Sequence, residues 1–122
     1  MEPEGFSAVW IDGKDRLALR GELDRFGARM LLAAFAARPV AEDLVLDLTE
    51  LTFIDAGGLG ALVRLNRELH GRGRRLELAG PAANVRRVLA VTGLDRAFGL
   101  AEADTDAEAD AGATPTTWSG AP

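Results

Sequence analysis

The feature that most constrains the fold is an apolar run at residues 44–48 (LVLDL), which is followed closely by a glycine-rich turn. This run is the most strongly apolar stretch of the chain, and such runs are typical of a central strand that is buried on both faces. Residues 51–54 carry the chain to the turn at 55–58 (DAGG), and residues 58–70 then show apolar side chains at helical spacing. A strand that leads directly into a helix is the repeating unit of a parallel α/β sheet.

The same alternation continues on both sides of this unit. Strands are predicted at 6–11, 16–20, 74–79 and 97–100, the first two as a hairpin, and helices at 25–38 and 82–91. Asp24 is the expected N-cap of the helix at 25–38, and Pro39 ends that helix. The order β-β-α-β-α-β-α-β predicts one α/β domain whose mixed, mostly parallel sheet has four to five strands.

The helical spacing also predicts which side chains face the core. In the helix at 25–38 the expected inward residues are Phe26, Met30, Leu31, Ala34 and Phe35. In the helix at 58–70 they are Leu59, Leu62, Val63, Asn66 and Leu69.

The charge of the chain is unevenly distributed. Residues 102–122 contain five acidic side chains and no Lys or Arg, so the first 101 residues carry 14 acidic and 14 basic side chains and are neutral. A neutral body argues against nucleic acid and anionic membrane as partners. We therefore predict a domain at 1–101 and a disordered acidic tail at 102–122. Trp118 in this tail is either a short docking motif or part of an inert end.

The chain has no cysteine, so disulfides and thiolate zinc sites are excluded. Its N-terminus is acidic and no apolar run approaches the ~18 residues of a membrane span, so neither a signal peptide nor membrane insertion is predicted. These features together predict a cytoplasmic protein.

Catalytic patterns are missing from the sequence. His70 is the single histidine and stands at a predicted helix end, where a cap or a solvated side chain is the usual role. Residues 57–60 (GGLG) match neither a dinucleotide-binding nor a Walker loop, and the carboxylates lack metal-ligand spacing. The sequence therefore predicts no enzyme, no metal and no cofactor.

The turn at 55–58 has two explanations that the residues alone leave open. Asp55 suits the N-cap of the following helix, where it would accept hydrogen bonds from free N–H groups. Gly57 and Gly58 each cost ~1 kcal/mol relative to Ala within a helix, so they indicate an unusual φ or a close contact. That contact could come from the domain's own sheet or from a partner.

Three segments resemble the STAS domain family, the anti-sigma-factor antagonists of bacteria. Residues 46–62 (LDLTELTFIDAGGLGAL) are similar to the family's signature, and residues 21–24 (GELD) are similar to its motif after the second strand. Residues 85–89 (VRRVL) with 92–95 (TGLD) resemble its final helix and turn. The resemblance spans roughly residues 6 to 100.

The resemblance implies a partner-switching role in which the protein binds an anti-sigma factor with a kinase-type fold. In the family the kinase ends this binding by phosphorylating a serine of the turn. Ala56 stands at the phosphoacceptor position here, and no Ser, Thr or Tyr occurs between Thr52 and Thr92, so we expect binding that phosphorylation of the turn cannot switch off. The expected partner-binding residues are Asp24, Asp55, Ala56, Gly57, Gly58, Leu59, Ala61 and Arg64.

An alternative role remains open. The chain could be a STAS scaffold or accessory subunit of a stress-sensing complex or of a lipid-transport ABC system. Self-association is compatible with either role.

Overall fold

The computed structural model describes residues 5–101, and the predicted tail at 102–122 lies outside this range. The element order agrees with the prediction, with one added 3-10 helix. The elements are β1 (Phe6–Trp10), β2 (Arg16–Leu23), α1 (Arg25–Ala36), β3 (Leu44–Ile54), α2 (Ala56–Gly71), β4 (Leu76–Ala79), α3 (Ala83–Thr92), η1 (Leu94–Arg96) and β5 (Gly99–Ala101).

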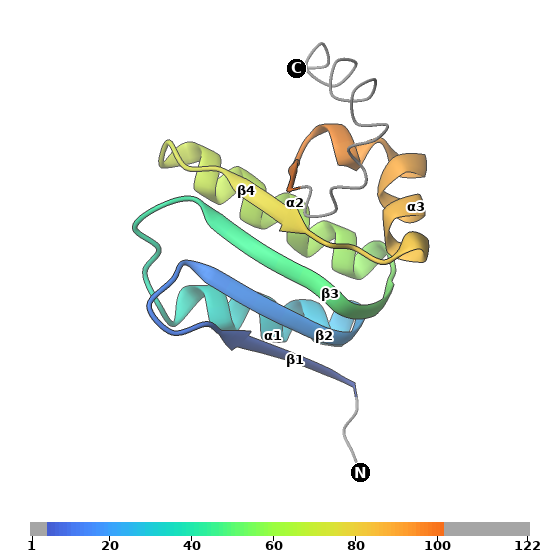
Figure 1. Cartoon of the computed structure of the whole chain (residues 1–122), viewed down its shortest axis with the longest axis horizontal. Coiled ribbons are helices and arrows are strands. Elements are labelled where there is room, and N and C mark those ends of the chain that lie inside the picture. Colours follow the sequence, from blue (N-terminus) through green and yellow to red (C-terminus); the bar gives the residue numbers. More distant parts are fainter. Residues whose placement is uncertain (1–4, 102–122) are drawn as a thin grey trace.

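The five strands form one sheet in the order β1-β2-β3-β4-β5 (Figure 1). β1 pairs with β2 in antiparallel orientation, and every other neighbouring pair is parallel. The predicted mixed, mostly parallel sheet is therefore confirmed. Because β2 to β5 run in the same direction, their carboxyl ends all point toward the same side of the sheet, which we call the carboxyl side.

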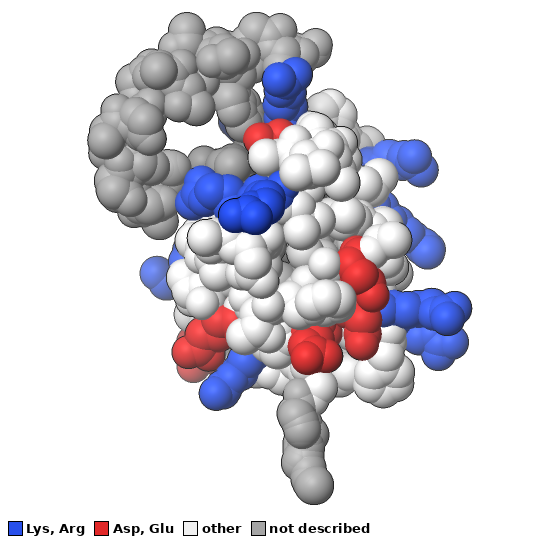
Figure 2. All heavy atoms as spheres, turned by 90° about the vertical axis from the view of Figure 1, so that its right-hand side faces the viewer, with Lys and Arg blue, Asp and Glu red and all other residues white. Residues whose placement is uncertain are grey.

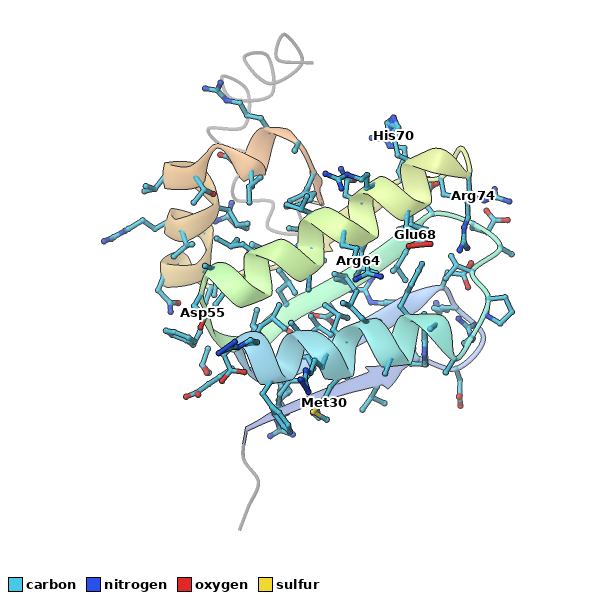
Figure 3. All side chains as sticks on the ribbon, turned by 180° about the vertical axis from the view of Figure 1, so that it is seen from behind. Met30, Asp55, Arg64, Glu68, His70 and Arg74 are labelled. Carbon is cyan, nitrogen blue, oxygen red and sulfur yellow. The ribbon has the colours of Figure 1, made fainter. Side chains whose placement is uncertain are left out.

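The two long helices α1 and α2 lie on the same face of the sheet (Figures 1 and 3). Leu44, Leu46 and Leu48 point toward this layer and have no exposed surface, whereas Val45 and Asp47 between them are only half-buried. The expectation that β3 is buried on both faces is therefore wrong. Its outward side chains are partly covered by cross-strand neighbours, as in the ion pair between Arg16 and Asp47 (N–O 3.5 Å).

The inward face of α1 differs from the predicted one. Phe26 and Met30 are 64% and 39% exposed, while Leu31 and Phe35 are buried as expected. The reason lies at Gly27, where an added Cβ would come within 2.8 Å of the Glu22 carbonyl oxygen. This close approach turns Gly27 toward the sheet and leaves its neighbour Phe26 facing solvent.

The inward face of α2 also shifts. Leu62 and Leu69 are fully buried as predicted, but Leu65 and Ala61 belong to the core as well. Ala61 is only 4% exposed, so the expectation that it lies on an accessible partner-binding face is wrong. Ala61 and Leu65 lie one turn apart on the side of the helix that starts at the buried Gly58. This side, rather than the one through Leu59 and Val63, faces the sheet.

Several boundaries move outward from the predicted ones. β3 is one continuous strand to Ile54, β2 continues to Leu23, and α2 starts at Ala56 because Asp55 caps it. None of the helices within residues 5–101 combines the length and apolarity that a membrane crossing requires.

Candidate functional site

Two helices begin side by side on the carboxyl side of the sheet, each capped by an aspartate. Asp24 follows β2, and its Oδ1 accepts a hydrogen bond from the Gly27 N–H (2.8 Å). Asp55 follows β3, and its Oδ1 accepts from the N–H groups of Gly57 (2.9 Å) and Gly58 (3.1 Å). Both predicted N-caps are confirmed. The two carboxylates satisfy free donors of the first helical turns and face the positive ends of α1 and α2.

The two glycines of the turn are explained by contacts inside the domain. A Cβ on Gly58 would collide with the Leu23 carbonyl oxygen and come within 2.9 Å of Ile54 Cγ1. A Cβ on Gly57 would lie 2.9 Å from the Arg25 Cα. Neither glycine has a positive φ. Of the explanations left open by the sequence, close packing against the domain's own β2 and α1 is therefore sufficient.

This close approach leaves a shallow depression of about 620 Å³ where the two helices begin. Figure 3 shows Asp55 at the start of α2, beside the start of α1. The Ala56 side chain is exposed there. The lining residues are Asp24, Arg25, Phe26, Asp55, Ala56 and Gly57.

The structure brings together four of the predicted site residues and separates the others. Asp24, Asp55, Ala56 and Gly57 share the depression, whereas Gly58 is buried beneath it. The partly buried Leu59 packs against the core, and the buried Ala61 belongs to it. Arg64 is exposed two turns further along α2 and lines a second depression of about 470 Å³ beside it.

Sequence reasoning missed three exposed residues close to the turn. Arg25 and Phe26 line the depression, and Phe53 precedes the last residue of β3 with 44% of its surface exposed. Phe26 was assigned to the core because it is a large apolar residue at helical spacing. Its position in the first helical turn, two residues after the N-cap Asp24 and directly before Gly27, is the signal in the sequence that it faces outward.

The residues that line the depression have no hydroxyl, thiol or imidazole group. Its lining has two carboxylates, one guanidinium and otherwise apolar or glycine surface. The nearest hydroxyl in sequence belongs to Thr52, which is exposed and donates a hydrogen bond to the Gly21 carbonyl (3.1 Å). The surface therefore offers apolar area and three charged side chains for contact with another molecule.

Figure 2 views the molecule from the side at which β3 ends, the right-hand side of Figure 1. The middle of this face is uncharged, and charged side chains surround it. An uncharged centre with a polar margin is the usual composition of a protein-binding surface.

Comparisons with known proteins agree with this geometry. The family model described as "Mlab, STAS domain" matches residues 7–102. The anti-sigma-B factor antagonists of Listeria monocytogenes serovar 1/2a and Listeria innocua serovar 6a are each 36% identical to this chain over 76 residues, which cover 61% of it and 67% of theirs.

Among solved structures, the unphosphorylated anti-sigma factor antagonist SpoIIAA superposes with a TM-score of 0.57 at 20% identity, over 87% of this chain and 96% of that one. This similarity supports the fold. The family match over residues 7–102 shows that the chain belongs to the STAS domain family, as a member with alanine at the turn position 56.

Proposed function

We propose that this protein is a non-enzymatic anti-sigma-factor antagonist that binds a kinase-fold anti-sigma factor and thereby regulates sigma-factor-dependent transcription in the cytoplasm. The observation that carries the proposal is the exposed turn at Ala56, set in a depression between two capped helices. The Listeria relatives named anti-sigma-B factor antagonists support the choice of partner.

The contact surface we propose is centred on Ala56 and includes the exposed rings of Phe26 and Phe53. Exposed aromatic rings contribute strongly to protein interfaces because they bury large apolar areas at low entropic cost. Phe26 is 64% exposed and lines the depression together with Ala56, and Phe53 is 44% exposed and stands two residues before Asp55. Asp24 and Asp55 would hold the backbone of this surface in place rather than supply binding energy themselves.

A charge introduced at Ala56 tests this surface. In Ala56→Glu the new carboxylate would be desolvated in the interface, so affinity for the kinase-fold anti-sigma factor of the source organism should fall by ~2 kcal/mol or more, about 30-fold. Isothermal titration calorimetry with the purified proteins measures this. The matched control is Ala90→Glu, which adds the same charge at an exposed position of α3, away from the described depressions. If wild type and Ala56→Glu bind with equal affinity, the contact surface does not include Ala56.

The absence of a hydroxyl at position 56 predicts that the complex resists the kinase. Incubation with ATP should leave the wild-type complex intact and its mass unchanged, whereas Ala56→Ser supplies an acceptor and should gain a phosphate. Phosphate adds about two negative charges to a close contact, so the modified variant should dissociate. A phosphate found on the wild-type turn by mass spectrometry would contradict the proposal.

The second candidate function is a STAS accessory subunit of a stress-sensing complex or a lipid-transport ABC system. The same observation favours it, because a subunit held permanently in an assembly needs no phosphorylation switch at Ala56. Stable binding to purified assembly subunits, with no binding to kinase-fold anti-sigma factors, would decide for this candidate.

A further inference from the structure

The outer surface of the helix layer carries arginines that have no acidic partner within residues 5–101. Arg25 and Arg29 of α1 and Arg64 and Arg67 of α2 are all exposed, and none of the ion pairs within the described range includes them. We call these four residues the helix-layer arginines.

The acidic side chains of this surface are engaged elsewhere. Glu68 of α2 pairs with Arg72 (N–O 3.6 Å), and Asp24 and Asp55 beside Arg25 accept hydrogen bonds from the backbone N–H groups that they cap. The arginines outnumber these three carboxylates, so the surface has an excess of positive charge.

The helix-layer arginines lie along the two helices that form the candidate site. Arg25 lines the depression at Ala56, and Arg29 follows one turn later on the same side of α1. Arg64 lines a groove of about 470 Å³ between α1 and α2 further along (Figure 3). Arginines of the open sheet face are paired instead, as Arg20 is with Glu50.

The sequence contains one segment whose charge complements this surface. Residues 102–122 carry Glu102, Asp104, Asp106, Glu108 and Asp110, with no Lys or Arg, and Trp118 follows. The family match ends at residue 102, so the segment is an addition to the STAS domain.

The path from β5 to the site is short enough for this segment. β5 is parallel to β4, so the chain leaves Ala101 toward the carboxyl side, where the depression lies. The registers place Ala101 level with Ala79 of β4 and Asp47 of β3. β3 continues for seven residues from Asp47 to Ile54, so the end of β5 lies roughly 23 Å short of the end of β3. Twenty-one further residues can span about 70 Å.

We propose that residues 102–122 of the same chain dock on the helix-layer arginines next to the turn at Ala56 and compete there with the protein partner. Tethering gives the segment an effective concentration on the order of millimolar, so contacts that are individually weak suffice for occupancy. This regulation rests on the proposed function and would act at a turn that lacks a phosphoacceptor. The docking itself does not depend on which partner binds.

A spin label in the full-length chain tests the docking. The chain has no cysteine, so Ser119→Cys gives a single attachment site for a nitroxide. Paramagnetic broadening of amide signals should be strongest around Arg25, Ala56 and Arg64, and it should disappear in 0.5 M salt, where the Debye length is about 4 Å. The matched control has the same length and label, with the five acidic residues of the segment changed to Asn or Gln.

Three results would overturn the docking. If the wild type and the neutralised control show equal broadening, the acidic side chains do not hold the segment on the arginines. Broadening confined to α3 and η1 would place the segment elsewhere. Broadening that persists when an unlabelled isotope-enriched chain is mixed with a spin-labelled one would assign the contact to a second copy.

The competition is tested separately by affinity. If the segment occupies half to nine-tenths of the molecules, neutralising it should lower the Kd for the anti-sigma factor by about 2- to 10-fold. An unchanged Kd beside clear broadening would overturn the competition. If Ala56→Glu leaves the affinity for the anti-sigma factor unchanged while the broadening around the helix-layer arginines persists, the proposed function is contradicted but the docking is not.

Discussion

Two glycines of α2, only two residues apart, should respond to the same substitution in opposite directions. Gly58 is buried against β2, where an added Cβ would collide with the Leu23 carbonyl oxygen and lie 2.8 Å from Leu23 Cγ. Gly60 is exposed, and an added Cβ there would meet nothing within 4 Å outside the helix's own backbone. Gly58→Ala and Gly60→Ala therefore form a matched pair in one helix.

The expected magnitudes follow from these contacts. Overpacking costs about 1–3 kcal/mol, and a backbone oxygen in a paired strand has little freedom to move away, so Gly58→Ala falls in the upper part of that range. The helix preference of Ala offsets about 1 kcal/mol, which leaves a net loss of about 1–2 kcal/mol in the free energy of unfolding. Gly60→Ala keeps the preference without the collision and should gain about 0.5–1 kcal/mol.

Thermal and urea unfolding of the full-length variants, followed by far-ultraviolet circular dichroism, measure both effects. For a domain of this size Tm should fall by about 5–15 °C in Gly58→Ala and rise by about 2–8 °C in Gly60→Ala. A Gly58→Ala variant as stable as the wild type would refute the internal-packing explanation of the turn. The glycine would then have to be explained by a partner.

Two further predictions concern aspartates. Asp55→Ala removes the acceptor for two N–H groups and should lower the free energy of unfolding by about 1 kcal/mol, while Asp55→Asn should cost only a few tenths, as urea titration would show. The backbone N–H of Glu42 (2.7 Å) is the main cause that holds the pKa of Asp15 below its ordinary value of 3.8. A carboxylate whose pKa is lower in the folded than in the unfolded state stabilises the protein at a pH above the unfolded pKa. This stabilisation is lost as the pH falls through the folded pKa. Asp15→Asn should therefore be less stable than wild type at pH 7, and the difference should shrink below about pH 4; a difference independent of pH would contradict this.

The structure places Asp15 in a contact that the sequence did not indicate. Its carboxylate accepts hydrogen bonds from Ala41 and Glu42 and pairs with Arg38 (N–O 3.2 Å), whose guanidinium lies 4.3 Å from the centre of the Trp10 ring. The residues come from the β1–β2 turn, the α1–β3 connection and β1. No local pattern links positions so far apart in the chain, so only the tertiary structure could reveal this connection.

Local signals in the sequence were sufficient for the order and type of the elements and for both helix caps. Hydrophobic periodicity and turn residues act over a few positions, and the aspartates Asp24 and Asp55 cap the helices that directly follow them. The resemblance to STAS domains rested on such local motifs as well, and the family match confirms it.

Packing across elements decided what the sequence left open or assigned wrongly. The exposure of Phe26 and the burial of Ala61 depend on how far each helix is turned about its axis, and close contacts at Gly27 and Gly58 set that rotation. The second face of β3 is uncovered because both long helices cross on one side. By itself the sequence determined that a capped, glycine-containing turn stands at residues 55–58. Only the tertiary structure decided that these glycines face the domain's own β2 and α1 and that Ala56 remains accessible, because both outcomes depend on neighbours that are distant in the chain.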